Sequence, residues 1–242
     1  MTASSILITG GTSLVAAAMI RQTHSQSSAK PAVALSRSAL PEASASRVHY
    51  VRGSVIDATC LQSVLRGNPN VVHTIGVFPD DNSESFDVNN QHSHCDSSIT
   101  VACTMAGKFD PNKNARKDRR ALAFVTSKRE AEAALLGIEF RNRIRIVIFR
   151  PGVIYSFHRR FGIIPLVFGL FIIGFMARPL RAYIPSNLRF LTDLPLQDDD
   201  IANAVFEAID NAAVEGIVDS DGIRLLAKAW GIKRIKSDLL LP

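Results

Sequence analysis

The feature that most constrains the fold is the alternation of short apolar strands with helices in the N-terminal third of the chain. The first strand candidate, Ile6–Thr9, runs into a glycine pair at positions 10 and 11, and a helical pattern follows from Ser13 to about Gln22. Further strand candidates follow at Ala32–Ser36, Val48–Val51 and Val71–Ile75. Asp57 is placed to cap a helix before the last of them. Strands and helices that alternate at this spacing form β-α-β units, so we expect an α/β fold with a parallel sheet.

The middle of the chain interrupts this pattern. We expect a helix from Asp87 to about Met105. The segment Lys108–Arg120 is polar and turn-forming, and no strand candidate stands between Gly107 and Arg120. Either one central strand is missing, or a short replacement lies at Ala121–Phe124.

The periodic pattern then resumes. It predicts a helix over Ser127–Leu136, a strand over Ile144–Phe149 and a helix over Ile201–Ala213. A soft boundary lies after Gly152, where the regular α/β pattern ends. We therefore divide the chain into an α/β region, residues 1–152, and a small C-terminal lobe, residues 153–242.

Composition and charge set broad limits on the type of protein. The 242 residues are 47% hydrophobic and 21% charged, which is typical of a globular protein with a sizeable core. A net charge of +6 suits an anionic partner such as a phosphate-bearing cofactor, acidic lipid or nucleic acid. The three cysteines, Cys60, Cys95 and Cys103, form no C-x-x-C motif, and their odd number together with the absence of a secretory signal favours a reducing compartment. The segment before Glu42 has a transit-peptide-like composition, but we favour its assignment to the first strand, turn and helix.

The turn after the first strand resembles a dinucleotide-binding loop. Such loops use glycines for the tight turn, for close approach of backbone to the pyrophosphate and for helix–strand packing. Gly10 and Gly11 supply the first of these, and Ala16 is a tolerated variant at the last position. Ser13 occupies the middle position, where its Cβ points toward the phosphate, so we expect weakened binding. The pattern favours a Rossmann-like doubly wound sheet and a dinucleotide-binding region at 1–152; a strand-turn-helix without a ligand is the alternative.

Three further positions bear on the choice of dinucleotide. Arg37 follows the second strand, where an arginine suits the 2′-phosphate of NADP and an acid suits NAD, although a solvated surface arginine explains it equally well. Gly76 follows the fourth strand, and the family resemblance given below implies that its backbone approaches the cofactor closely. Ser54 follows the third strand, where the same resemblance implies a position beside the adenine. The cofactor is therefore NADP or NAD, with weak or vestigial binding.

Several phrases along the chain carry a family resemblance. They are Val71-Val-His-Thr-Ile-Gly76, Ser127-Lys-Arg-Glu-Ala-Glu132, Phe149-Arg-Pro-Gly-Val-Ile-Tyr155 and Pro195-Leu-Gln-Asp-Asp-Asp-Ile-Ala202. Together they resemble an atypical, mitochondrial branch of the extended short-chain dehydrogenases/reductases. That branch includes a nucleotide-binding accessory subunit of respiratory complex I and a fungal subunit of the coenzyme Q biosynthetic complex. The resemblance covers most of the chain, apart from residues 103 to 123.

The resemblance also identifies a departure at the catalytic position. In the superfamily a tyrosine lies four residues before a lysine, so both share one helix face, and the lysine assists proton transfer by the phenol and holds the nicotinamide ribose. Here those positions are Phe124 and Lys128. Phe124 cannot transfer a proton, whereas Lys128 can still bind ribose or phosphate. Ser127 and Glu130 also form a capping box, so a plain helix start is the alternative.

The resemblance implies a function for the whole chain. We expect a catalytically impaired NAD(P)-binding-fold protein that acts as an accessory or scaffold subunit in quinone (coenzyme Q) metabolism, on the matrix side of the mitochondrial inner membrane. Its expected partners are a dinucleotide, membrane lipid or a quinone, and a multi-protein complex. The alternative is an NADP-dependent oxidoreductase of a hydrophobic carbonyl or quinone-like substrate, with Tyr155 as a non-standard proton donor.

An uncharged apolar stretch, residues 161–177, lies between His158-Arg-Arg160 and Arg178. It is slightly short for a spanning helix and contains Pro165. We favour a helix that lies on the membrane surface with arginines at anionic headgroups; a spanning helix and a buried core helix are the alternatives. No metal is expected, because His92 and His94 at i and i+2 do not share a helix face. No nucleic acid is expected, because the basic run Lys113–Arg120 lacks interleaved aromatic residues.

Overall fold

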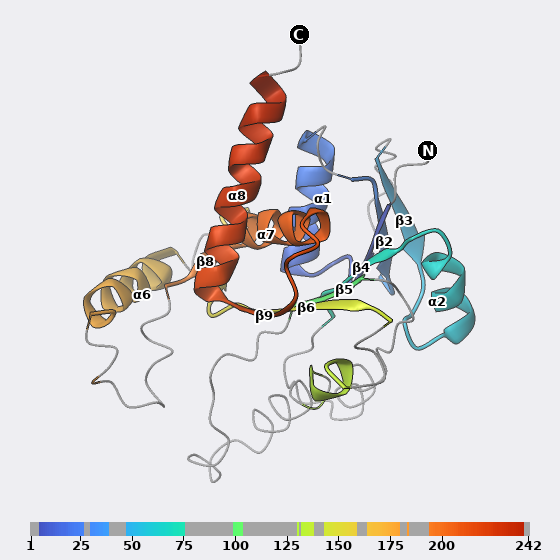
Figure 1. Cartoon of the computed structure of the whole chain (residues 1–242), viewed down its shortest axis with the longest axis horizontal. Helices are drawn as coiled ribbons and strands as arrows, with labels where there is room; N and C mark the ends of the chain where they lie inside the picture. The colour runs from blue at the N-terminus through green and yellow to red at the C-terminus, as the bar shows by residue number, and fades with distance from the viewer. Residues whose placement is uncertain are drawn as a thin grey trace.

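The computed structural model describes residues 5–26, 30–38, 47–75, 99–103, 130, 132–137, 143–158, 164–179, 183 and 194–239. Among these residues, seven strands form one parallel sheet in the order β3-β2-β1-β4-β5-β6-β9 (Figure 1). The strands are β1 (Ile6–Thr9), β2 (Ala32–Ser36), β3 (Val48–Arg52), β4 (Asn70–His73), β5 (Ile99–Cys103), β6 (Arg145–Arg150) and β9 (Gly216–Asp219). The predicted α/β fold with a doubly wound parallel sheet is therefore confirmed.

The order of the strands places a topological switch point between β1 and β4. The chain moves from β1 outward to β2 and β3, and then returns to β4 on the other side of β1. In the register, Thr9 at the end of β1 lies opposite Leu35 of β2 and His73 of β4. Ligands of open α/β sheets bind outside the carboxyl ends of the strands at such a point.

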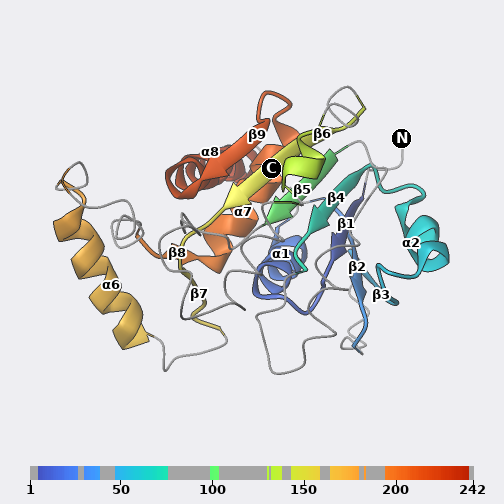
Figure 2. The same cartoon turned by 90° about the horizontal axis from the view of Figure 1, so that it is seen from below.

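Helices cover both faces of the sheet because side chains alternate along each strand. The helices are α1 (Leu14–Ser25), α2 (Ala58–Leu65), α6 (Ile164–Ala177), α7 (Asp198–Asp210) and α8 (Ser220–Leu239). Ile6 and Ile8 point into the larger core with α1, α7 and α8, whereas Leu7 points into the core with α2 (Figure 2). A helical segment at residues 132–135 adds Leu135 to a cluster of β6 isoleucines. β7 (Ile154–Tyr155) and β8 (Leu196–Gln197) form a separate two-stranded sheet.

One part of the sequence prediction is wrong. The last residues of the helix expected over Asp87–Met105 form the strand β5, which pairs with β4 on one side and with β6 on the other. Ile99, Thr100 and Val101 are β-branched, and hydrogen bonding to two neighbouring strands outweighs a weak helical pattern. The central strand, for which the sequence left open either absence or a short replacement at residues 121–124, is therefore present as β5. The replacement strand proposed at residues 121–124 lies outside the described residues.

The ends of the helices follow the capping residues. Ser13 caps α1, and the Asp57 carboxylate accepts hydrogen bonds from the backbone N–H groups of Thr59 and Cys60, as predicted. α7 begins at Asp198, three residues before the predicted start, because three aspartates in its first turn favour the positive end of the helix dipole. The division of the chain at residue 152 stays a prediction, although β9 joins the sheet that contains β1.

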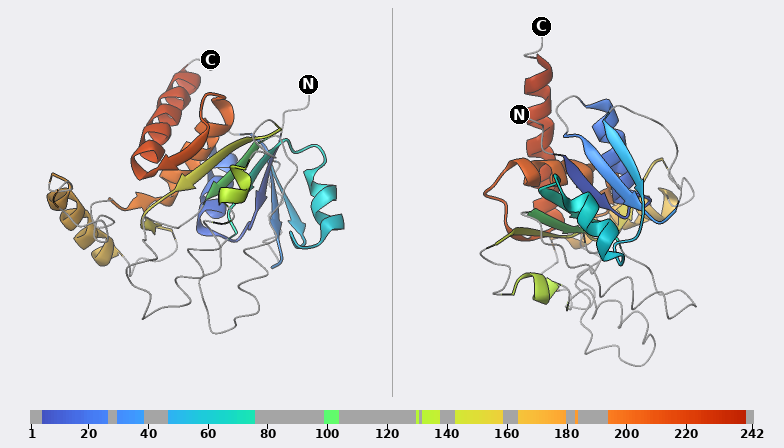
Figure 3. Two further views of the ribbon diagram at one scale, coloured as in Figure 1. Left: turned by 60° about the horizontal axis from the view of Figure 1, so that its bottom comes forward. Right: turned by 90° about the vertical axis from the view of Figure 1, so that its right-hand side faces the viewer.

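α6 lies apart from the sheet at one side of the molecule (Figure 3). Phe168, Phe175 and Met176 are 66 to 76% exposed, so the interpretation as a buried core helix is wrong for this face. Among the described residues, no helix combines the length and the apolar character needed to cross a bilayer.

Candidate functional site

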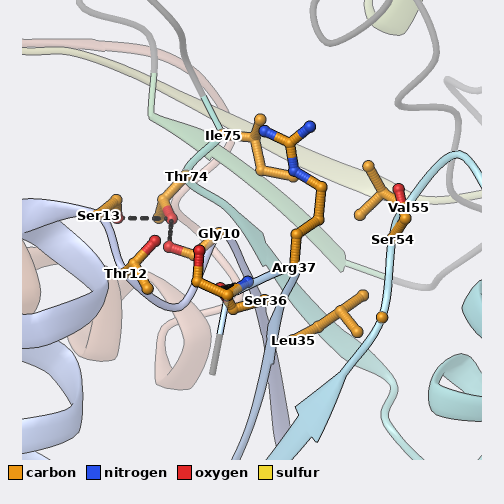
Figure 4. Close-up of a pocket in the computed structure, with 12 residues that line it drawn as sticks. Gly10, Thr12, Ser13, Leu35, Ser36, Arg37, Ser54, Val55, Thr74 and Ile75 are labelled. Atoms are coloured by element: carbon orange, nitrogen blue, oxygen red, sulfur yellow. Dashed lines mark hydrogen bonds between the residues drawn. The ribbon is translucent and has the colours of Figure 1, made fainter. Parts of the chain in front are cut away.

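A pocket of about 200 Å³ opens at the carboxyl ends of the strands around the switch point (Figure 4). Its walls come from the β1–α1 turn and from the residues that follow β2, β3 and β4. The lining residues are Gly10, Thr12, Ser13, Leu35, Ser36, Arg37, Ser38, Gly53, Ser54, Val55, Thr74 and Ile75. The structure therefore brings together three of the predicted residues, Gly10, Ser13 and Arg37.

Gly10 makes the tight turn that the sequence predicts. Its φ is +82°, a conformation that side chains rarely adopt. A Cβ at this position would lie 2.9 Å from Ile75 Cγ1 and 3.2 Å from the Ile75 backbone nitrogen. The N–H groups of Gly10 and Gly11 both donate to the Leu35 carbonyl at 3.0 Å, which holds the turn against β2. A glycine is thus required at position 10, and Gly11 secures the turn by its backbone.

The Ser13 side chain makes two hydrogen bonds within the protein. Its hydroxyl oxygen accepts from the Ala16 N–H at 3.1 Å and caps α1, and its hydroxyl donates to Thr74 Oγ1 at 2.8 Å. Ser13 lines the pocket, and its hydroxyl is directed at Thr74 (Figure 4). Since the first N–H groups of a helix have no intrahelical partner, those of Leu14 and Val15 remain as donors for an anion at the start of α1.

Thr74 is a site residue that the sequence interpretation missed. Its hydroxyl donates to the Thr9 carbonyl at 2.8 Å and lies 3.2 Å from the Gly10 carbonyl. It therefore joins the end of β4 to the turn after β1 and receives the bond from Ser13. In the structure Thr74 directly follows β4, whereas the sequence prediction extended the fourth strand to Ile75. The available signal was its place near the strand end, because residues at the carboxyl ends of adjacent parallel strands meet at one edge of the sheet.

Arg37 supplies the positive charge at the pocket. It follows β2 and makes no ion pair with another described residue, and in Figure 4 its side chain extends beside Ile75. Ser36 and Ser38 flank it in the sequence and also line the pocket. The buried Ser36 hydroxyl accepts from the Ser38 N–H at 3.3 Å. One guanidinium and neighbouring serine hydroxyls provide donors for a phosphate.

The third wall follows β3. The Gly53 N–H donates to the Ser36 carbonyl at 3.0 Å, and a Cβ at Gly53 would overlap Cys60 Sγ. This close contact brings Ser54 and Val55 to the pocket. The Ser54 carbonyl accepts from the Asp57 N–H at 3.2 Å, so the turn leads directly into the cap of α2.

Three of the predicted positions cannot be assigned to the pocket or away from it. Gly76, Phe124 and Lys128 lie outside the described residues. Close to that segment, the buried carboxylate of Glu132 forms an ion pair with Arg150, whose Nε donates to Glu132 Oε1 at 3.3 Å. The described residues include no group of His, Cys, Asp or Glu side chains able to hold a metal ion.

Tyr155, the proposed non-standard proton donor, lies in β7 rather than in the pocket lining. Its ring packs edge-to-face on Phe157 at 5.3 Å and on Phe171 of α6 at 6.1 Å between ring centroids. Burial raises the pKa of Tyr155 above its ordinary value, and the nearby Asp200 carboxylate raises it further. The phenol thus keeps its proton at neutral pH and can serve only as an acid.

Comparisons with solved structures identify the fold family. UDP-N-acetylglucosamine 4-epimerase from Bacillus cereus has a TM-score of 0.59 and 14% identity, and the match covers 94% of this chain and 82% of that one. The Bordetella bronchiseptica enzyme WbmG in complex with NAD and UDP has a TM-score of 0.61 and 16% identity, with coverages of 93% and 78%. A short-chain dehydrogenase/reductase superfamily protein from Agrobacterium tumefaciens with bound NAD has a TM-score of 0.56 and 13% identity, with coverages of 89% and 76%.

Sequence comparisons add no closer relative, since no family model and no curated protein matches the chain. At these identities the structural likeness defines the fold alone. The chain therefore has the Rossmann-like α/β fold seen in proteins of the short-chain dehydrogenase/reductase superfamily.

Proposed function

We propose that the chain binds a nicotinamide dinucleotide, with NADP preferred to NAD, and that it has little or no catalytic activity of its own. The observation that supports binding most directly is the Gly10 turn with its positive φ at the switch point, beside the start of α1 and Arg37. The turn gives a phosphate access to backbone N–H groups, and the helix dipole attracts its charge. The structural neighbours from Bordetella and Agrobacterium hold NAD, which supports the same class of ligand here.

The preference for NADP rests on Arg37. A guanidinium at the end of the second strand pairs with a 2′-phosphate, and the described residues that line the pocket include no carboxylate that would accept from a 2′-hydroxyl. Titration of NADPH and NADH against the protein, followed by calorimetry, tests both statements. We expect NADPH to bind at least about tenfold more tightly, and Arg37→Ala to remove that difference. Arg66→Ala, an exposed arginine after α2 that does not line the pocket, is the matched control.

The limited catalysis follows from Phe124. The position that supplies the phenol in related enzymes has no titratable group, so Lys128 has no tyrosine whose pKa it could lower. The alternative is an NADP-dependent oxidoreductase of a hydrophobic carbonyl or quinone-like substrate with Tyr155 as the acid. Turnover of such a substrate that is lost in Tyr155→Phe, with NADPH binding unchanged, would establish this alternative.

The cellular role that we propose is an accessory or scaffold subunit of quinone (coenzyme Q) metabolism on the matrix side of the mitochondrial inner membrane, in contact with lipid, quinone and a protein complex. The family resemblance of the sequence motifs supports the compartment and the pathway. The exposed apolar face of α6, with Arg178 directly after it, supports attachment to a membrane surface. Fractionation of mitochondria tests the proposal: the protein is expected in the membrane fraction, facing the matrix.

A further inference from the structure

α8 is apolar on two opposite sides. On the inner side, Ile223, Ala227 and Trp230 are buried, and the Trp230 ring stacks on Phe206 of α7 with 5.4 Å between ring centroids. On the outer side, four large apolar side chains are 56 to 78% exposed. They are Leu225, Ile232, Ile235 and Leu239. The inner side already packs the helix against the rest of the protein. Packing within the described part of the chain therefore does not explain why the outer side carries apolar residues.

These four residues form one narrow line along the helix, which we call the outer seam. Their spacing of seven, three and four residues is the a and d spacing of a heptad pattern, and the one seam position between Leu225 and Ile232 is Lys228. At about 100° per residue the centre of the seam lies about 150° from the centre of the buried side. Figures 1 and 3 show that the C-terminal end of α8, where the seam continues, projects from the body of the molecule.

The charges on this side disfavour a second copy as the occupant. In a parallel pair of α8 helices, Lys228 faces the Lys228 of the other copy. In an antiparallel pair, positions a of one helix face positions d of the other, so Lys228, at a d position, meets an apolar residue. Lys236, which flanks the seam, adds a further positive charge. Asp221, one heptad before Lys228, is already paired with Arg178 and Arg224, so neither arrangement offers Lys228 a free carboxylate. An unpaired charge within a helix interface is costly.

The shape of the seam disfavours a bilayer. A helix that lies on a membrane presents a broad apolar face with its charges at the border. The exposed face of α6 has that form, whereas the outer seam is a strip with a lysine in its middle. A strip with a and d spacing is typical of helix-to-helix contact.

We propose that the outer seam of α8 docks an acidic amphipathic helix of a partner protein. The apolar side of that helix packs on Ile232, Ile235 and Leu239, and one of its carboxylates pairs with Lys228. Acidic residues at its flanks face Lys236. The seam lies apart from the dinucleotide pocket, so the proposal does not depend on the function proposed above.

Two synthetic peptides test this contact. Both peptides have about three heptads, with leucine at every a and d position except one central d position. One peptide has glutamate at that central d position and at all e and g positions, and the other has lysine at the same positions. Fluorescence anisotropy against the full chain is expected to show binding of the glutamate peptide at least about tenfold tighter than that of the lysine peptide. The double variant Ile232→Gln/Ile235→Gln is expected to lose about tenfold of this affinity, and Lys228→Glu to reverse the order of the two peptides.

Matched controls separate the seam from other surfaces. Ile172→Gln/Ile173→Gln changes two exposed isoleucines of α6 and is expected to leave peptide binding unchanged. NADPH titration of every variant reports on the dinucleotide pocket independently, and circular dichroism verifies the helix content. The proposal is overturned if the glutamate peptide does not bind or binds no better than the lysine peptide. Self-association in sedimentation, or binding to phosphatidylglycerol vesicles, that depends on Ile232 and Ile235 would overturn it as well.

Discussion

The Ser13 hydroxyl donates a hydrogen bond to Thr74 Oγ1 over 2.8 Å, and this bond ties the start of α1 to the end of β4. The same hydroxyl caps α1 by accepting from Ala16, so one side chain serves both contacts. In dinucleotide-binding folds, a glycine at the second position of the loop lets the backbone approach the pyrophosphate. Here Ser13 occupies that position, and its hydroxyl stabilises the fold. Its Cβ is expected to reduce the space through which a pyrophosphate reaches the backbone.

Two substitutions of Ser13 separate these roles. Ser13→Ala keeps the Cβ and loses both hydrogen bonds, so it is expected to lower the free energy of unfolding by about 1 kcal/mol without tightening NADPH binding. Ser13→Gly removes the Cβ as well and is expected to tighten NADPH binding several-fold. Urea unfolding and calorimetric titration measure the two quantities. Equal dissociation constants for the two variants would show that the Cβ does not limit binding.

Gly10 allows a sharp test of the turn because the chain contains a matched glycine. Gly67 has a φ of +86°, close to that of Gly10, but no atom lies within 4 Å of a Cβ built on it. Gly67→Ala therefore measures the cost of the backbone conformation alone, about 1 kcal/mol. Gly10→Ala adds overlap with Ile75 and is expected to lower the free energy of unfolding by about 2 to 3 kcal/mol and to abolish NADPH binding. Equal losses of stability would contradict the packing argument.

The pair of Glu132 and Arg150 is expected to show strong coupling. Arg150→Met leaves a buried carboxylate without its partner and is expected to cost about 3 kcal/mol of unfolding free energy. Combining it with Glu132→Leu removes both charges, so the double variant is expected to be more stable than Arg150→Met alone. A double-mutant cycle by urea unfolding measures the coupling, and strictly additive losses would exclude it.

The alternation of strands and helices in the sequence made most of the sheet predictable. The strand that was not predicted was missed for a physical reason. Strands β1, β2 and β4 are short and buried, so the apolar pattern alone located them. β5 has five residues and gains its stability from bonds to both β4 and β6, which no local pattern records. The position of β5 therefore follows from its pairing in the folded sheet and not from its own sequence pattern.

The candidate site was predictable at positions where the function requires one particular type of residue. Gly10 and the Arg37 position follow from the geometry of a phosphate-binding turn. Thr74 was missed because its role depends on a contact with a residue 61 positions away along the chain, Ser13. Such contacts between strand ends arise from the strand order, and the sequence interpretation had placed the strands without deriving which hydroxyls would meet.

Asp200 is expected to make stability depend on pH in a direction opposite to ordinary acid denaturation. Burial raises its pKa above the ordinary value of 3.8, against the lowering effect of Arg224, and the neighbouring Asp199 and Asp198 carboxylates raise it further. Between the unfolded and folded pKa values the folded state binds more protons, so this residue's contribution to stability falls as pH rises through that window. Asp200→Asn is therefore expected to raise the free energy of unfolding at neutral pH, with a gain that shrinks toward pH values below 3.8.

Thermal unfolding at a series of pH values measures this gain. Asp238→Asn, at an exposed position near the end of α8, is the control for the effect of an Asp-to-Asn substitution as such. A gain for Asp200→Asn that is constant over the whole range would contradict the assignment.

The outer face of α6 gives a prediction about membranes. Phe168, Phe175 and Met176 lie at i, i+7 and i+8, so they share one helix face, and Ile172 joins them at i+4. Burying an exposed aromatic side chain in lipid contributes about 2 kcal/mol, so Phe168→Gln/Phe175→Gln is expected to reduce co-sedimentation with phosphatidylglycerol vesicles by at least about tenfold. NADPH affinity is expected to remain unchanged, because neither phenylalanine lines the pocket. The α8 variant Ile232→Gln/Ile235→Gln is the control and should sediment with vesicles like the wild-type chain; vesicle binding that survives the loss of both phenylalanines would show that α6 is not the lipid contact.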